Sequence, residues 1–146
     1  MLEDYYKPTK IEYKCDQCKR MRSCIRKLDI AHLPPVLIIH LNRFEHDVLM
    51  KKKQNYVEFP IENLDISQYM SSVCKSRSSG YDLYGIANHY GTIDGGHYTA
   101  YCKSSITKSW FKFDDHEVYD ISLSSIKTSA AYILFYESNR LSVDVM

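Results

Sequence analysis

The chain has 146 residues, a formal net charge of +1 and 45% hydrophobic residues. This length supports one hydrophobic core, and this hydrophobicity argues against disorder. A nearly neutral chain has no field that would make nucleic acid or an anionic membrane its main partner, and no apolar run is long enough to cross a bilayer.

The cysteines indicate the expected compartment. There are five of them, an odd number, and the first ten residues contain no apolar segment typical of a secretion signal. We therefore expect a cytoplasmic or nuclear protein whose thiols stay reduced. In that setting a Cys-x-x-Cys pair indicates metal binding or redox chemistry before it indicates a disulfide.

Residues 11–30 are predicted to form a hairpin tip and its returning strand. The tip carries a Cys-x-x-Cys pair and a basic run, Lys19, Arg20, Arg22, Arg26 and Lys27. These cations could form a solvated face, or they could meet an acidic or polar protein surface. The sequence leaves both interpretations open.

Cys15 and Cys18 have the spacing of one ligand pair in a zinc ribbon. Four-coordinate structural zinc needs a second pair, and the sequence does not contain one in a recognisable spacing. Cys24 could supply a third thiolate, and His32 or His46 a fourth ligand. A half site or a vestige is therefore favoured over a complete zinc site within this chain.

Two prolines, Pro34 and Pro35, precede the apolar run 36–41. Proline prevents helix and favours extended backbone, so this run is predicted to be a buried strand. Residues 71–80 are polar, lack periodicity and end in glycine, which predicts a mobile loop.

The rest of the chain is predicted to form antiparallel strands with little helix. Residues 81–89 and 97–102 partly alternate between apolar and polar side chains and flank a glycine turn. The remaining predicted elements are a hairpin over 110–113 and 117–119, one helical turn within 122–128, and a strand over 131–136 that is buried on both faces. The predicted architecture is mainly β.

His97 begins one of these strands and Asp114 ends the next. Because paired strands lie about 4.8 Å apart, the imidazole and the carboxylate can meet across the ladder. Such a carboxylate fixes the tautomer of the imidazole and leaves the other ring nitrogen free to accept a proton from a nucleophile. From spacing alone, however, a half-buried hairpin histidine beside a polar turn at Asp114 and Asp115 is the favoured explanation.

No nucleophile completes this arrangement. Cys102 lies five residues beyond His97, so its side chain is expected on the other face of the strand. Cys74 lies in the polar loop without a helix start that would lower its pKa, and Cys24 is better explained as a structural thiol.

The glycine turn before His97 leaves room for another chain. Gly95 and Gly96 have no Cβ, so a second backbone could approach them closely. A substrate peptide laid along the edge of the strand would need such an approach.

Seven short motifs follow one another along residues 13–137. They are Leu33–Phe44, Val57–Pro60, Tyr81–Tyr84, Asn88–Gly91, Gly95–Tyr101, Trp110–Asp115 and Ala131–Tyr136. Together they resemble the C-terminal half of the catalytic domain of ubiquitin-specific proteases, the papain-like cysteine deubiquitinases. Within that family the chain is most similar to the endosomal branch associated with signalling adaptors. The resemblance implies an α+β fold, the mainly antiparallel β palm-and-fingers portion of a papain-like cysteine protease, without the thumb.

The resemblance also implies roles for the residues of the His-Asp arrangement. His97 would be the general base, Asp114 the residue that orients it, and Asp115 a supporting polar residue beside the oxyanion. The loops 91–96 and 71–80 would be blocking loops that close over the ubiquitin tail.

Binding roles follow from the same resemblance. Gly95, Gly96 and Tyr98 would bind the ubiquitin tail, which ends in Gly-Gly and must thread a narrow channel. Cys15 and Cys18 would be half of the zinc ribbon at the fingertips that hold the body of ubiquitin. The implied partners are ubiquitin and ubiquitinated proteins, and zinc is the one cofactor implied. An endosome-associated location is possible besides the cytoplasm and the nucleus.

The implied domain layout is a partial catalytic domain at 1–137, with half of the fingers at 11–30 and the palm at 33–137, and a tail at 138–146. The nucleophile of the family lies in a Gly-Asn-Thr-Cys-Tyr-like segment, together with donors of the oxyanion hole, and nothing here resembles it. The chain alone is therefore expected to be inactive. Its two apolar strands, without a thumb to cover them, are expected to make it aggregation-prone or partner-dependent.

Three functions remain compatible with the sequence. The first is the family activity, thiol-dependent hydrolysis of ubiquitin conjugates, with this chain supplying the His and Asp of the triad. The second is a catalytically inactive ubiquitin-binding or regulatory fragment, and the third is a zinc-dependent interaction module. The intact base and its orienting carboxylate favour the first.

Overall fold

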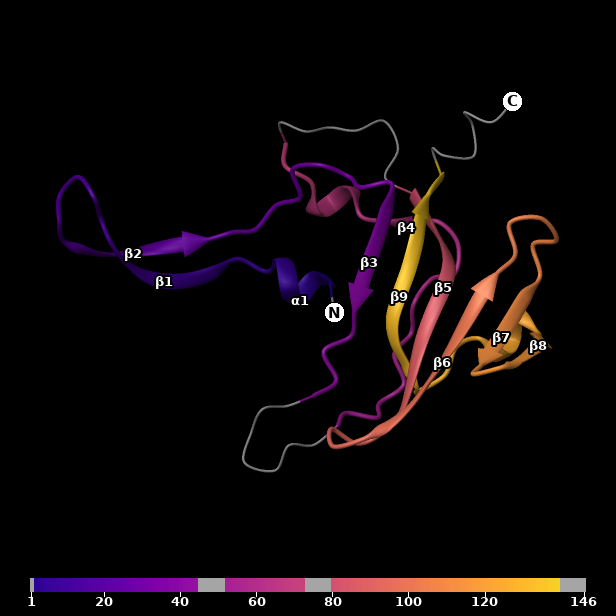
Figure 1. The fold of residues 1–146 in the computed structure, drawn as a ribbon. Helices are drawn as coiled ribbons and strands as arrows, with labels where there is room; N and C mark the ends of the chain where they lie inside the picture. The colour runs from indigo at the N-terminus through magenta and orange to yellow at the C-terminus, as the bar shows by residue number, and fades with distance from the viewer. Residues whose placement is uncertain (1, 45–51, 73–79, 140–146) are drawn as a thin grey trace. The chain divides into compact units, whose positions relative to one another are not determined.

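The structure is a computed structural model that describes residues 2–44, 52–72 and 80–139. The chain divides into two compact units, one of residues 1–33 and 66–77, the other of residues 34–65 and 78–146. Figure 1 shows the elements of each unit. Most of the predicted mobile loop at 71–80 lies outside the described residues. None of the described helices is long and apolar enough to span a membrane.

The first unit is built on a two-stranded antiparallel ribbon. Its elements are α1 (Leu2–Tyr6), β1 (Thr9–Lys14), β2 (Met21–Arg26) and the short 3-10 helix η1 (Ser67–Tyr69). The ribbon confirms the hairpin predicted at 11–30. Helix α1 was not predicted, and Pro8 restricts the residue before it to extended backbone, which explains why the helix ends at Tyr6. The Tyr6 ring stacks on Tyr69 with centroids 4.7 Å apart.

The second unit is a seven-stranded antiparallel sheet. Its strands are β3 (Val36–His40), β4 (Leu64–Asp65), β5 (Gly80–Gly91), β6 (Gly96–Lys103), β7 (Trp110–Asp114), β8 (Glu117–Ile121) and β9 (Ala131–Ser138). The order is β3-β9-β5-β6-β7-β8, with β4 paired to β5. Strands β5 to β8 therefore form three consecutive hairpins, which Figure 1 shows side by side. The 3-10 helix η2 (Leu123–Ser125) confirms the predicted helical turn.

The prediction of a buried strand at 36–41 is wrong. In the described residues β3 pairs with β9 alone and forms an edge of the sheet. Val36 is 40% exposed and Ile38 is 58% exposed. Strand β9 is also buried on one face only, since Leu134 and Tyr136 are buried while Phe135 is half-buried.

A bulge in β5 decides which side chains face the core. Tyr81 and Leu83 are buried before a shift of register against β9, and Ile86 and Asn88 are buried after it. A bulge inserts one extra residue, so the side chains that face inward are odd-numbered before the bulge and even-numbered after it. Since Asn88 lies opposite Thr99 on β6, the inner face continues along β6 through alternate residues.

Candidate active site

His97 and Asp114 meet at the open end of this inner face. His97 is the second residue of β6 and Asp114 is the last residue of β7, the neighbouring strand. His97 Nε2 lies 2.6 Å from Asp114 Oδ1, and the two side chains are 48% and 25% exposed. The predicted meeting of imidazole and carboxylate across the ladder is therefore present.

Each member of the pair shifts the titration of the other. The hydrogen bond to Asp114 is the main cause that raises the pKa of His97 above its ordinary value. The pKa of Asp114 is lowered, first by Lys112 and then by His97. Between these two pKa values both groups are charged, so Nε2–H donates to the carboxylate. When the imidazole is neutral, the same bond keeps the proton on Nε2 and leaves Nδ1 as the free base.

The pair also links stability to pH. The raised pKa of His97 means that its contribution is present below the ordinary histidine pKa and is lost as pH rises through the folded value. The lowered pKa of Asp114 means that its contribution is present above the ordinary aspartate pKa and is lost as pH falls through the folded value. Both side chains are exposed enough for solvent to screen these effects.

Lys112 belongs to the site and was missed by the sequence reasoning. Its Nζ lies 2.7 Å from Asp114 Oδ2, so each oxygen of Asp114 has a different partner. Lys112 and Asp114 are two residues apart in a strand, and alternation places such residues on the same face. This spacing of two residues could have predicted the contact between Lys112 and Asp114.

Asp115 completes the cluster from the turn between β7 and β8. Its φ of 51° lies in the left-handed region, and one ligand atom each from His97, Asp114 and Asp115 lie within 4.8 Å of one another. Three such atoms can bind a cation. Both oxygens of Asp114 are engaged, however, and the ammonium group of Lys112 repels a cation. The geometry therefore fits a base with its orienting carboxylate better than a metal site.

The other residues predicted near His97 are placed differently. Tyr98 follows His97 in β6 and so points to the opposite face, where its ring packs on His89 with centroids 4.6 Å apart. The structure thus brings His97, Asp114 and Asp115 together and does not bring the Tyr98 side chain to them. The backbone of Gly95 and Gly96 lies directly before His97.

The sequence of this chain is similar to those of known proteins. The sequence matches the profile of the family described as ubiquitin carboxyl-terminal hydrolase over residues 5–136. The chain belongs to the ubiquitin carboxyl-terminal hydrolase family. Curated relatives include ubiquitin carboxyl-terminal hydrolase 8 of Arabidopsis thaliana, 49% identical over 84% of this chain and 14% of that protein. Ubiquitin carboxyl-terminal hydrolase 2 of Gallus gallus is 41% identical over 94% of this chain and 37% of that protein.

Solved structures of the SAGA DUB module, one of which is described as from yeast, have the same fold. One is the module of Ubp8, Sgf11, Sus1 and Sgf73 bound to monoubiquitin. It superposes with a TM-score of 0.81 and 36% sequence identity, over 94% of this chain and 31% of that chain. The same module bound to ubiquitin aldehyde gives a TM-score of 0.80 and 35% identity. This chain is therefore a mainly antiparallel part of a papain-like fold and spans about a third of those structures.

The resemblance noted in the sequence implies zinc at the tip of the ribbon, where Cys15 and Cys18 could supply two ligands. The Cys15 N–H donates to the Arg20 carbonyl at 3.0 Å, and Lys19, at φ 58°, closes the turn by donating to the Cys15 carbonyl. Hydrogen bonds lower the pKa of Cys18, first with the Arg20 backbone, then with the Arg22 side chain and with Cys15. The thiolate, which binds metal, is thereby favoured.

The other proposed zinc ligands do not join this pair. Cys24 lies opposite Ile11, four residues before Cys15 on β1, which is roughly 13 Å along the ribbon. The prediction that Cys24 could supply a third thiolate is therefore wrong. Within residues 2–44, 52–72 and 80–139, no His, Cys, Asp or Glu joins Cys15 and Cys18 in a set of three ligands. His46 lies outside these ranges.

Cys102 is the one cysteine in the sequence of the unit that contains His97. Cys102 lies opposite Gly85 and five residues from His97, so its thiol is on the other face of β6. Burial raises the pKa of this thiol. Both observations agree with the expectation that Cys102 is not the nucleophile.

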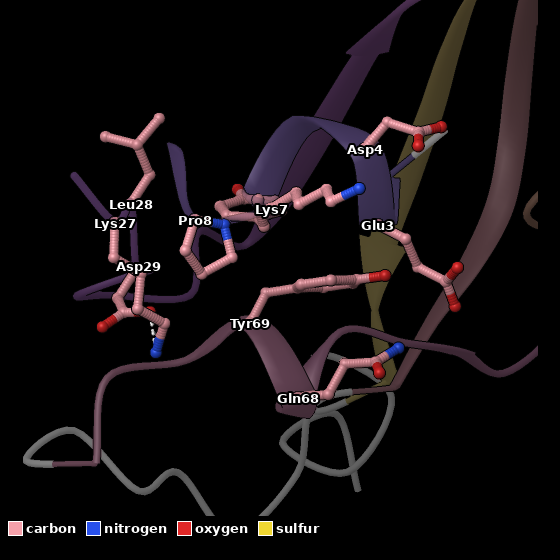
Figure 2. Close-up of a pocket in the computed structure, with 10 residues that line it drawn as sticks. Glu3, Asp4, Lys7, Pro8, Lys27, Leu28, Asp29, Gln68 and Tyr69 are labelled. Atoms are coloured by element: carbon pink, nitrogen blue, oxygen red, sulfur yellow. Dashed lines mark ion pairs between the residues drawn. The ribbon is translucent and has the colours of Figure 1, made fainter. Parts of the chain in front are cut away.

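A hollow of about 500 Å³ lies in the first unit of the chain. Its lining, most of which is labelled in Figure 2, consists of Glu3, Asp4, Tyr6, Lys7, Pro8, Lys27, Leu28, Asp29, Gln68 and Tyr69. Lys27 Nζ pairs with Asp29 Oδ1 at 2.9 Å. No histidine or cysteine is among these lining residues.

A matched pair of glycine substitutions tests the turn before His97. A Cβ on Gly96 would overlap the Tyr90 carbonyl oxygen and the His89 ring, whereas a Cβ on Gly95 would meet nothing within 4 Å. We expect Gly96→Ala to lower the free energy of unfolding by about 1–3 kcal/mol. We expect Gly95→Ala to change it by less than about 0.5 kcal/mol.

Denaturant unfolding followed by the fluorescence of Trp110, the single tryptophan, measures both effects. Trp110 is 4% exposed and lies in the same sheet as Gly96. Equal unfolding midpoints for the two variants would show that the turn relaxes freely around Gly96.

Proposed function

We propose that this chain is part of a cysteine deubiquitinase domain that hydrolyses ubiquitin conjugates. The observation that carries the proposal is the bond between His97 Nε2 and Asp114 Oδ1, in a chain of the ubiquitin carboxyl-terminal hydrolase family. The chain spans 14–37% of the curated relatives described above. The thiol nucleophile is proposed to come from a segment outside these 146 residues.

In this mechanism His97 Nδ1 accepts the proton of the thiol. The thiolate attacks the carbonyl carbon of the isopeptide bond, and the leaving lysine amine takes the proton from the imidazolium as the C–N bond breaks. His97 then removes a proton from water, which hydrolyses the thioester. Asp114 stabilises the imidazolium at each stage, and Asp115 is proposed as a polar neighbour of the oxyanion.

Ubiquitin and ubiquitinated proteins are the proposed partners. Support comes from the solved relatives, two of which are described as bound to monoubiquitin and to ubiquitin aldehyde. Gly95, Gly96 and Tyr98 are proposed to contact the ubiquitin tail. For Gly95, support comes from the open space above its Cα, which leaves room for another backbone. A cytoplasmic location is proposed, with the nucleus and endosomes as alternatives.

Reconstitution tests the proposed function. The chain is joined to the N-terminal part of the Gallus gallus relative, which is 41% identical to it over 138 residues, and hydrolysis of a fluorogenic ubiquitin conjugate is measured. We expect turnover from the joined protein and none from either part alone. A folded joined protein that binds ubiquitin without turnover would overturn the proposal and support the alternative, an inactive ubiquitin-binding or regulatory fragment.

Zinc is proposed to need ligands from outside the chain, because the described ribbon offers Cys15 and Cys18 without a third ligand. We expect the purified chain to retain well under one equivalent of zinc after dialysis, since structural zinc uses four ligands. Metal analysis by mass spectrometry measures this. One tightly held equivalent, lost in Cys18→Ser, would instead support the zinc-dependent interaction module.

A further inference from the structure

Asp114 is held from two sides. Oδ1 bonds to His97 Nε2 at 2.6 Å, and Oδ2 pairs with Lys112 Nζ at 2.7 Å. The Lys112 and Asp114 side chains are 29% and 25% exposed, so the pair is better shielded than an ion pair on the open surface. With both oxygens engaged, the carboxylate plane has little freedom to rotate away from the imidazole.

Lys112 is itself fixed by its neighbours on the sheet. It lies between Tyr101 on β6 and Tyr119 on β8 in the ladder. Its ammonium group lies 5.9 Å from the centroid of the Tyr119 ring, within range of a cation–π contact. The Tyr119 hydroxyl donates in turn to Glu117. The lysine side chain, which is flexible when unsupported, is thereby directed at Asp114.

Lys112 also balances charge around His97. Asp114 and Asp115 both favour the imidazolium, and the Lys112 cation opposes it. Tyr90 lies opposite His97 on β5, and Glu117 lies opposite Asp114 on β8. Among these neighbours Lys112 is the one cation, so its loss would leave His97 beside carboxylates alone.

We propose that Lys112 is a positioning residue for His97, acting through Asp114. Its ammonium group holds the carboxylate with Oδ1 toward Nε2 and offsets the negative charge of Asp114 and Asp115. The inference rests on the proposed function, because it assigns Lys112 to the general base of that reaction. Lys112 itself touches neither substrate nor nucleophile in this role.

The direct test is an NMR titration of His97 in the whole chain, labelled with ¹⁵N at histidine. In Lys112→Met we expect the titration midpoint of His97 to move to lower pH, because release of Asp114 weakens the hydrogen bond that raises this pKa most, and this effect outweighs the loss of the opposing cation. In the neutral ring we expect a smaller population of the Nε2–H tautomer, because Asp114 is released. Lys112→Arg keeps the cation and should restore both properties.

Lys127 provides a closely matched control. Its ammonium group pairs with Glu58, its side chain is 24% exposed, and it lies 5.8 Å from the centroid of the Phe59 ring. Lys127→Met should leave the His97 titration unchanged. Tyr119→Phe, which keeps the ring beneath Lys112, should also leave it unchanged.

The outcomes separate clearly. A midpoint that stays or rises in Lys112→Met overturns the inference. A fall that Lys112→Arg does not reverse also overturns it, because the effect would then come from lost packing of the lysine stem. A fall shared by Lys127→Met would point to a general effect on the fold and would count against Lys112 as well.

The reconstituted enzyme separates this inference from the proposed function. In Lys112→Met we expect the acid limb of the pH dependence of kcat/KM to move to lower pH, while the affinity for ubiquitin is kept. The loss at neutral pH should be smaller than the about 10²–10⁴-fold contribution of general acid–base catalysis. If the unmodified joined protein has no turnover but the NMR shift is present, the proposed function fails and the positioning by Lys112 stands.

Discussion

His97→Ala is expected to abolish ubiquitin hydrolysis by the reconstituted enzyme while ubiquitin binding is retained. The imidazole carries both proton transfers of the proposed reaction, and its bond to Asp114 shows that one ring nitrogen is already committed. General acid–base catalysis contributes about 10²–10⁴-fold, and loss of one member of a triad removes most of the cooperation among the three. We therefore expect a fall in kcat of at least about 10³-fold.

Steady-state hydrolysis of a fluorogenic ubiquitin conjugate measures the rate, and calorimetric titration with ubiquitin measures binding. His116→Ala is the matched control, because His116 is exposed in the β7–β8 turn, two residues from Asp114. We expect that variant to keep its turnover. Comparable activity in the His97 variant would refute the assignment of the general base.

Asp114→Ala is expected to cost several powers of ten in kcat/KM. Without Asp114, the ring of His97 can flip or adopt the other tautomer, and the imidazolium loses its closest negative charge. Asp115 is the one residue that could compensate. Its carboxylate contributes to the field at His97, but the hydrogen bond to the ring comes from Asp114.

Single and double variants distinguish these contributions. We expect Asp115→Ala to lose much less than Asp114→Ala, and the double variant to resemble Asp114→Ala. The pH dependence supplies a second readout, because loss of Asp114 should move the titration of His97 to lower pH. A loss of less than about tenfold in Asp114→Ala would mean that Asp115 or water orients the ring.

The hairpins around His97 could be predicted because their signals are local. Glycines at both ends of the turn 91–96 and the acidic turn after Phe113 separate strands of alternating side chains, and the structure places β5 to β8 accordingly. Strand spacing showed that His97 and Asp114 could meet, although spacing alone favoured a half-buried hairpin histidine beside a polar turn. Residues carried by one ladder are the easiest part of a site to predict.

The features that were predicted wrongly or missed depend on contacts formed in the folded sheet or have no sequence pattern. An apolar run such as Val36–His40 has the same sequence pattern in the centre of a sheet and at an edge, so its exposure could not be predicted. Lys112 was not singled out, because its role depends on its contact with the carboxylate of Asp114, which the fold brings beside it. The short helix α1 has one turn and no periodic pattern to detect.

The consecutive hairpins of β5 to β8 have a consequence for folding. Every contact that joins His97 to Asp114 and Lys112 closes a loop of fewer than about 20 residues, and short loops cost little chain entropy. Contacts of this kind form early and rapidly, because no distant segment must arrive first. We therefore expect His97, Asp114 and Lys112 to come together early in folding, without waiting for a segment distant in the sequence.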